Sequence, residues 1–409
     1  MIYMPSEVLH KALKPVRRMV TRGGKTFMTT VYVGSTKAER AEQPKKVAII
    51  ERPSKMVDRG VSRVTVDLMK RTEDVIEFAP SDALAVEKVL AFQRDYFGDR
   101  PEPSVYEIVQ MATEEVEYAR SLGGDTGEQW YEESMVKVRS ILTNRFPDMA
   151  ADTEWDFFLA ILAVTSPAMS PGPNLRAAVK VYEEYSKTGK IPIIDIDTDK
   201  AYGVASTANL ERFRDLLAKY KTKAAFVEFI NGVSTSGELR DKGGKVSGSR
   251  SEAAFNSMMM GEKVGMFYQS MRGTEGAVTV DRWAIRSFYR WTGRLREGVQ
   301  IDPDTKERKR IIEDKVSTDD RRAVEYVMQT VGEKLGLSAR QVQAVMWYYE
   351  KRLYKKLGMA KLAAMTDDFA KVAETMYLQK SVSDISTMLR SGTMPTFREF
   401  LAAIMEVKL

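Results

Sequence analysis

Lys263 and Asp281 are the two residues of this chain whose types and spacing could do chemistry together. Lys263 follows a glycine in the Gly-Glu-Lys-Val-Gly run at 261–265, and Asp281 comes eighteen residues later. A lysine in the first turn of a helix is opposed by the positive end of the helix dipole. That field, combined with partial burial, favours the neutral and nucleophilic amine. The spacing therefore predicts an amine nucleophile and a carboxylate at the two ends of one structural unit.

The segment between these residues predicts one helix bounded by turns. The glycine at 261 opens the helix, Gly273 to Gly276 form a second turn, and Asp281 suits the N-cap of the next helix. Upstream, residues 155–164 are apolar nearly all round and predict a buried helix. A Ser-Pro loop at 165–173 breaks that helix, and an amphipathic helix starts at Asn174.

These residues resemble the signature of the helix-hairpin-helix DNA glycosylase superfamily, which includes endonuclease-III-like and 8-oxoguanine-glycosylase-like enzymes. That signature is a hairpin glycine, one residue, a lysine, about one helix, and then Val-Asp. The matching residues are Gly261, Lys263, Val280 and Asp281. The resemblance implies that the lysine attacks the sugar C1′ and that the aspartate assists departure of the base.

Two positions depart from the signature. Met259 stands where the family hairpin usually has a glycine, and Trp283 stands where the family often has His. The order of buried helix, polar loop and Asn174 is similar to the opening of the same glycosylase core, where the loop lies against the duplex. The Gln-Ala-Val-Met-Trp element at 343–347 is similar to one in phage-encoded members of the superfamily.

The resemblance implies a mainly α fold with a helix-hairpin-helix DNA-glycosylase-like core at 151–360. A basic N-terminal arm at 1–80 is expected to carry short strands around an Arg-Gly-Gly-Lys turn, and a helical lead-in covers 81–150. A helical extension is expected at 361–409. Residues 254–260 are expected to be helical, and 301–315 to be a charged linker.

The expected function is a DNA-binding protein that acts on a base as a glycosylase or glycosylase/lyase, with Lys263 and Asp281 as the catalytic pair. One alternative is a phage thymine-hypermodification transferase that attaches an amine or amino acid to 5-(pyro)phosphorylmethyl-uracil in DNA. A second alternative is a non-catalytic DNA-binding protein of a phage or mobile element.

Basic and polar residues around the pair are candidate DNA contacts. An arginine stripe at four-residue spacing begins at 282, and a glycine-rich basic segment at 237–250, expected to be a flexible loop, leads into the Lys263 unit. The candidate DNA contacts are Gly261, Ser166, Asn174, Arg240, Lys242, Lys245, Arg250, Arg282, Arg286 and Arg290. The candidates for stacking on a base are Tyr268, Trp283 and Trp347.

Composition narrows the chemistry. The 409 residues contain no cysteine and one histidine, His10, which argues against disulfides, an iron–sulfur cluster and Cys- or His-rich metal sites. We therefore expect no metal and no cofactor. The net charge of +6 suits a polyanionic partner such as DNA. No apolar run approaches the roughly 20 residues of a membrane span. With no signal-peptide core at 1–20, a cytoplasmic location in a bacterial or phage-infected cell is expected.

Overall fold

The structure is a computed structural model, and it divides the chain into two compact units, Met1–Ile49 and Ile50–Leu409. The residues that it describes are 14–22, 25–33, 82–98, 102–122, 127–167, 169–195, 200–202, 204–301, 306–313, 315–359 and 368–377. Most of the expected N-terminal arm and of the C-terminal extension lies outside these ranges.

The first unit contains a two-stranded antiparallel hairpin. Strand β1 (Lys14–Arg22) pairs with β2 (Lys25–Val33), and Arg22 lies opposite Lys25 at the closed end. Both expected strands are therefore present on either side of the Arg-Gly-Gly-Lys turn.

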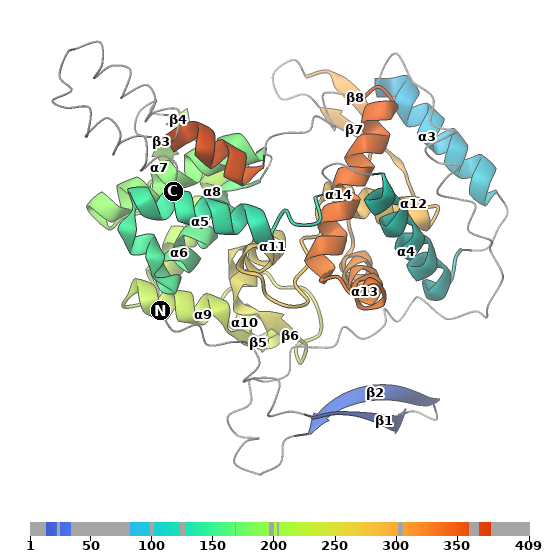
Figure 1. The fold of residues 1–409 in the computed structure, drawn as a ribbon, viewed down its shortest axis with the longest axis horizontal. Coiled ribbons are helices and arrows are strands. Elements are labelled where there is room, and N and C mark those ends of the chain that lie inside the picture. Colours follow the sequence, from blue (N-terminus) through green and yellow to red (C-terminus); the bar gives the residue numbers. More distant parts are fainter. Residues whose placement is uncertain are drawn as a thin grey trace, which may run out of the picture. The chain divides into compact units, whose positions relative to one another are not determined.

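The second unit is mainly helical, as expected (Figure 1). Its helices before the turn at 273–276 are α3 (Asp82–Phe97), α4 (Val105–Ser121), α5 (Glu132–Arg145), η1 (Pro147–Ala150), α6 (Asp152–Thr165), α7 (Pro171–Thr188), α8 (Val204–Leu217), α9 (Lys223–Asn231), α10 (Ser236–Asp241), η2 (Asn256–Met260) and α11 (Glu262–Arg272). After that turn come α12 (Arg282–Trp291), α13 (Thr318–Leu335), α14 (Ala339–Lys356) and a helix over 369–377. Three short antiparallel pairs complete the unit: β3 (Ile194–Asp195) with β4 (Lys200–Ala201), β5 (Val233–Thr235) with β6 (Ala253–Phe255), and β7 (Glu297–Ile301) with β8 (Arg308–Ile312).

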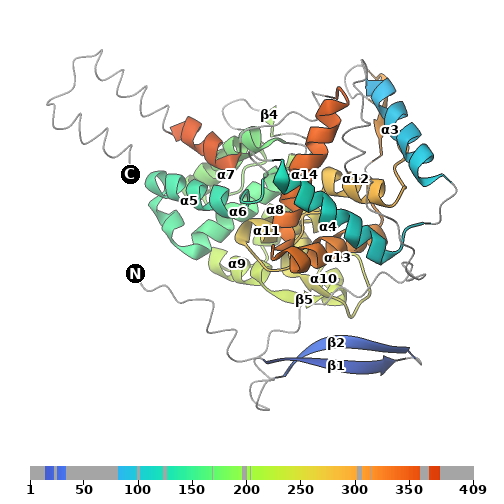
Figure 2. The same ribbon diagram turned by 45° about the vertical axis from the view of Figure 1, so that its right-hand side comes forward.

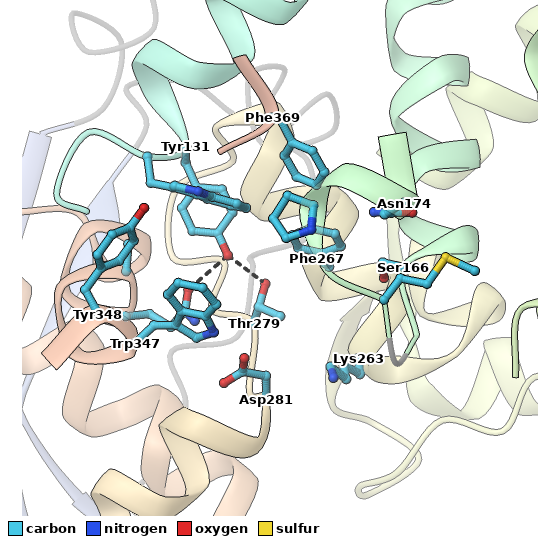
Figure 3. Close-up of a pocket in the computed structure, with 15 residues that line it drawn as sticks. Tyr131, Ser166, Asn174, Lys263, Phe267, Thr279, Asp281, Trp347, Tyr348 and Phe369 are labelled. Atoms are coloured by element: carbon cyan, nitrogen blue, oxygen red, sulfur yellow. Dashed lines mark hydrogen bonds between the residues drawn. The ribbon is translucent and has the colours of Figure 1, made fainter. Parts of the chain in front are cut away.

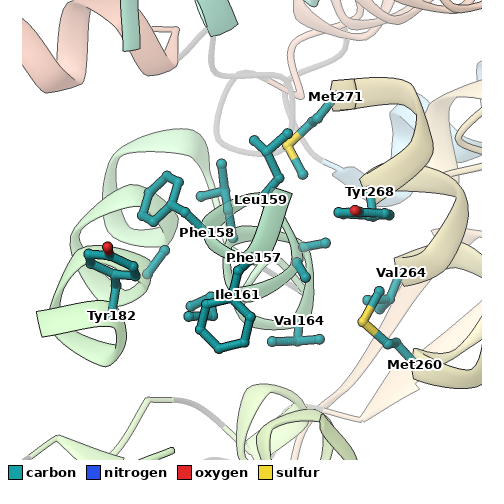
Figure 4. Packing of buried hydrophobic residues seen from close by; sticks show 14 of the residues in the cluster. Phe157, Phe158, Leu159, Ile161, Val164, Tyr182, Met260, Val264, Tyr268 and Met271 are labelled. Carbon is teal, nitrogen blue, oxygen red and sulfur yellow. The ribbon is translucent and has the colours of Figure 1, made fainter. Parts of the chain in front are cut away.

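The first hydrophobic core surrounds α6, as its apolar sequence predicts. Phe157, Phe158, Leu159 and Ile161 are all fully buried (Figure 4). Helices α7, α8, α9 and α11 all contact α6. Because α6 is covered on every side, it anchors the helix that carries Lys263.

The second hydrophobic core lies among α4, α12, α13 and α14, which contact one another (Figures 1 and 2). Arg290 of α12 is buried there between Glu115 and Glu350 and donates hydrogen bonds to both carboxylates. Removing one partner from such a buried network leaves an uncompensated charge and costs about 3–5 kcal/mol. The network therefore fixes α12 against α4 and α14.

Two expectations about secondary structure are wrong. Residues 254–260 form strand β6 and the 3-10 helix η2 instead of one helix, because Phe255 pairs with Val233 of β5. Part of the expected linker at 301–315 is a strand, since β8 pairs with β7 and Glu297 forms an ion pair with Arg310 at 2.7 Å. Among the described residues, no helix is long and apolar enough to cross a membrane.

Candidate active site between two cores

A cavity of about 140 Å³ is lined by residues from both hydrophobic cores (Figure 3). Lys263 and Asp281 both line it, so the structure brings the predicted pair to one site. The other lining residues are Trp130, Tyr131, Ser166, Met169, Pro171, Asn174, Phe267, Thr279, Gln343, Ala344, Trp347, Tyr348 and Phe369. The volume is close to that of a cavity of roughly 150 Å³ that holds one benzene ring.

Lys263 occupies the first turn of α11, directly after a glycine with unusual backbone geometry. Gly261 has φ of +117°, a conformation that favours glycine, and it separates η2 from α11. The Lys263 side chain is exposed, so the expected partial burial is wrong. Its ammonium has no hydrogen bond or ion pair within the described part of the chain, and it is therefore available to a ligand.

Gly265 fixes the position of α11 one turn after the active-site glycine. A Cβ added there would clash with the backbone of Ser257, whose hydroxyl donates a hydrogen bond of 3.0 Å to the Gly265 carbonyl. Only a residue without a side chain allows η2 and α11 to approach so closely. This contact sets the direction in which Lys263 leaves its helix.

Asp281 is the N-cap of α12, as the sequence predicts. Its Oδ1 accepts hydrogen bonds of 3.0 Å from the backbone N–H groups of Trp283 and Ala284. No hydrogen bond to Oδ2 is found among the described residues. Figure 3 shows Asp281 and Lys263 on opposite sides of the cavity, and no ion pair joins them within the described ranges. One carboxylate oxygen is thus fixed and the other is left for a ligand.

Tyr131 links the two cores at the wall of the cavity. Its hydroxyl donates to Gln343 Oε1 at 2.9 Å and lies 3.4 Å from Thr279 Oγ1 (Figure 3). Burial raises the pKa of Tyr131, and the nearby charge of Asp281 raises it further. The residue therefore stays a neutral phenol and remains a donor to the glutamine.

Asn174 lies in the first turn of α7, where the Ser-Pro loop ends. Thr165 Oγ1 donates to Asn174 Oδ1 at 2.7 Å, and Asn174 is only 2% exposed. Ser166 Oγ donates to the Ala163 carbonyl at 2.8 Å, so its proton is already used inside the protein. Ser166 and Asn174, which the sequence analysis singles out, both line the cavity.

Trp347 is the one predicted stacking residue that lines the cavity. Tyr268 is fully buried beside α6 and donates from its hydroxyl to Asn231 Oδ1. Trp283 packs edge-on against Tyr354 in the second core. The stacking role expected for Tyr268 and Trp283 is therefore wrong, because both side chains pack in the hydrophobic cores and neither lines the cavity.

Lys351 lies beside the lining residue Trp347, and the sequence did not reveal its burial. It is 5% exposed, and its Nζ lies 4.0 Å from the centre of the Trp347 ring, one helical turn earlier. Burial lowers its pKa to about 8, and the charge of Asp281 opposes that shift. In the sequence, the four-residue spacing from Trp347 shows only that Lys351 and Trp347 lie on the same face of a helix. It does not show whether that face is buried.

The expected arginine stripe does not form a DNA-facing ridge. Arg286 is 1% exposed and donates to the Ile312 carbonyl at 3.0 Å, and Arg290 lies in the buried network described above. Arg282 is exposed. The face of α12 that carries Arg286 and Arg290 packs into the second core. Arg290 can be buried there because two buried carboxylates, Glu115 and Glu350, compensate its charge.

The basic segment before the Lys263 unit is only partly available to a ligand. It begins inside α10, and Arg240 donates to the carbonyls of Val246 and Gly248 at 2.9 Å each, so the expectation of a flexible loop is wrong for that part. Arg250 is exposed but pairs with Asp241 at 2.6 Å. The two exposed lysines of the segment are Lys242 and Lys245.

Glu262 and Glu325 connect the Lys263 turn to α13. Glu262 accepts a hydrogen bond from the backbone of Ser247 and lies 3.5 Å from Arg321. Glu325 is buried nearby, and burial raises its pKa to about 7, while Arg321 lowers it. Glu325 is therefore a titratable carboxyl of α13 close to Glu262, whose charge also raises its pKa.

Comparison with known proteins gave no match to a family model, to a curated protein or to a solved structure.

Proposed function

We propose that this protein acts on a base in DNA, as a glycosylase or glycosylase/lyase, with Lys263 and Asp281 as the catalytic pair. The observation that supports this most is one ring-sized, aromatic-walled cavity lined by both an unpaired amine and a half-free carboxylate. A base inside a duplex is not accessible to a side chain, so the nucleotide must leave the stack at a cost of a few kcal/mol. Trp347 and Phe267 offer apolar surface on which such a base would lie.

In the proposed reaction, Asp281 Oδ2 stabilises the positive charge that develops on the sugar as the C1′–N bond breaks. The electron pair of that bond leaves with the base, which takes up a proton. The Lys263 amine, after losing a proton to solvent, forms a bond to C1′. Opening of the sugar ring then gives a Schiff base, and loss of a C2′ proton expels the 3′ phosphate.

A borohydride trapping assay tests this proposal. Duplexes that carry abasic, uracil, 8-oxoguanine or 5-hydroxymethyluracil sites are incubated with the protein and reductant. A protein–DNA adduct that survives denaturation is expected with at least one of them. No adduct and no released base with any of the duplexes would overturn the glycosylase proposal.

The exposure of Lys263 favours a second candidate, a transferase that attaches an amine or amino acid to 5-(pyro)phosphorylmethyl-uracil in DNA. An exposed ammonium suits a phosphate contact better than it suits a neutral nucleophile. In that reaction the incoming amine displaces pyrophosphate at the 5-methylene carbon, and Asp281 Oδ2 accepts the amine proton. Amine incorporation into modified DNA without a trapped adduct would distinguish this candidate.

A further inference from the structure

Two side-chain amides present their NH₂ ends without partners at the wall of the cavity. Gln343 Oε1 accepts from Tyr131, and Asn174 Oδ1 accepts from Thr165. Neither amide nitrogen has a hydrogen bond within the described ranges, although the two residues are only 4% and 2% exposed. Both nitrogens stay open to solvent through the cavity, and a ligand oxygen could take the place of water on each of them. The two nitrogens therefore point to a ligand.

The neighbouring hydroxyls do not compete for this role. Ser166 donates to Ala163, Thr279 donates to Ser270 Oγ at 3.1 Å, and Tyr131 donates to Gln343. Each of these three protons is used inside the protein. In this arrangement the Gln343 amide uses its oxygen on Tyr131, and its nitrogen has no partner among the described residues.

The cavity also limits the size and shape of the ligand. Its volume of about 140 Å³ matches one six-membered ring. Trp130, Phe267 and Trp347 line it, so a flat ring is favoured.

We infer that this cavity binds a pyrimidine-dione base of the uracil or thymine type, with the amide NH₂ groups of Asn174 and Gln343 donating to its ring carbonyl oxygens. Uracil and thymine present two carbonyl oxygens, whereas cytosine presents an amino group in place of one of them. That amino group would face an amide donor, so cytosine leaves one amide unsatisfied. A purine such as hypoxanthine carries a single carbonyl oxygen and likewise leaves one amide unsatisfied. The inference rests on the proposed function for the idea that the ligand is a DNA base.

Free bases test the inference without requiring turnover. Saturation-transfer NMR competition measures the binding of uracil, cytosine and hypoxanthine to the intact protein. Uracil is expected to bind at least about tenfold more tightly than cytosine, since one well-placed base contact discriminates by about 1–3 kcal/mol. Hypoxanthine is expected to bind more weakly than uracil for the same reason. Equal binding of uracil and cytosine, or binding of neither, would overturn the inference.

The Gln343→Glu variant identifies the donor. Glutamate keeps the acceptor for Tyr131 but replaces the NH₂ donor by an acceptor, so the preference for uracil should fall at least tenfold and shift towards cytosine. Gln341→Glu is the matched control on α14, because its capping box with Ser338 accepts either residue. An unchanged preference in a folded Gln343→Glu variant would overturn the assignment. A uracil preference without any DNA adduct or released base would leave this inference standing and refute the glycosylase proposal instead.

Discussion

Tyr131 and Gln343, 212 positions apart in the chain, are joined by a hydrogen bond of 2.9 Å from the phenol to the amide oxygen. Tyr131 belongs to the first core. Gln343 lies on helix α14, which packs into the second core. The bond therefore connects the two halves of the cavity wall and also fixes which end of the amide a ligand meets.

Lys263→Gln is expected to abolish the trapped adduct while changing the free energy of unfolding by no more than about 0.5 kcal/mol, as is usual for exposed positions. Gel analysis of borohydride-treated labelled duplexes measures the adduct, and thermal denaturation measures stability. Lys137→Gln, an exposed lysine on α5, is the control and should trap normally. A persistent adduct in Lys263→Gln would contradict the assignment and direct attention to Lys351.

Asp281→Asn should keep the helix cap but lose the charge that assists base departure. Turnover is expected to fall about 10²–10³-fold, the usual effect of removing one group that stabilises transition-state charge. Asp281→Ala should show the same loss and, in addition, a stability cost of about 1 kcal/mol, because alanine cannot cap. Single-turnover base release and denaturant unfolding separate the two effects. Normal turnover in Asp281→Asn would refute the role of the carboxylate.

Arg290→Met should destabilise the protein by about 3–5 kcal/mol, because Glu115 and Glu350 would be left buried together without their cation. Arg282→Met, on the same helix but exposed, should cost little. Urea unfolding measures both. If the two variants lost equal stability, the buried network would not be what holds α12.

Gly265→Ala should destabilise the protein by about 1–3 kcal/mol, since the added methyl group has no space against the Ser257 backbone. Because the strain falls two residues from Lys263, adduct formation should also slow. Gly189→Ala adds a methyl group with nothing within 4 Å but at a φ of +69°, so it should cost about 1–2 kcal/mol through the backbone alone and leave adduct formation normal. Normal stability and trapping in Gly265→Ala would show that η2 and α11 do not need this close approach.

Glu325→Gln should stabilise the protein at about pH 8 and change little at about pH 4.5. The pKa of Glu325 is about 7 in the folded protein against 4.5 for an ordinary glutamate. Between these values the folded state retains a proton that the unfolded state releases, so the free energy of unfolding falls as pH rises. Glutamine removes that fall, which is on the order of 1–3 kcal/mol.

Thermal melting of both proteins across this pH range tests the prediction, with Glu333→Gln as the exposed control on α13. A stability difference between wild type and Glu325→Gln that does not depend on pH would contradict the raised pKa.

Local patterns predicted the elements around Lys263 and Asp281 because turns and caps depend on near neighbours. The glycine at 261, the N-cap at Asp281 and the buried α6 were all visible in this way. The side of a helix that becomes buried depends on distant partners. Arg290 was misassigned because its carboxylates lie 175 and 60 positions away.

The same reason explains the parts of the cavity that sequence did not reveal. Tyr131 and Lys351 acquire their roles only when α14 packs beside the first core, and short-range periodicity contains no information about that packing. The strand β6 was missed because it pairs with a strand that is distant in the sequence. Val233 of β5 and Phe255 of β6, which lie opposite each other, are 22 positions apart.

The chain order of the cavity residues has a consequence for synthesis on the ribosome. Lys263 and Asp281 are made before Gln343, Trp347 and Phe369, which complete the wall. A nascent chain that ends before residue 343 therefore carries the amine and the carboxylate without the enclosing aromatic surface. Under the proposed function, the pair and its enclosing wall are therefore together only after α14 has emerged and docked.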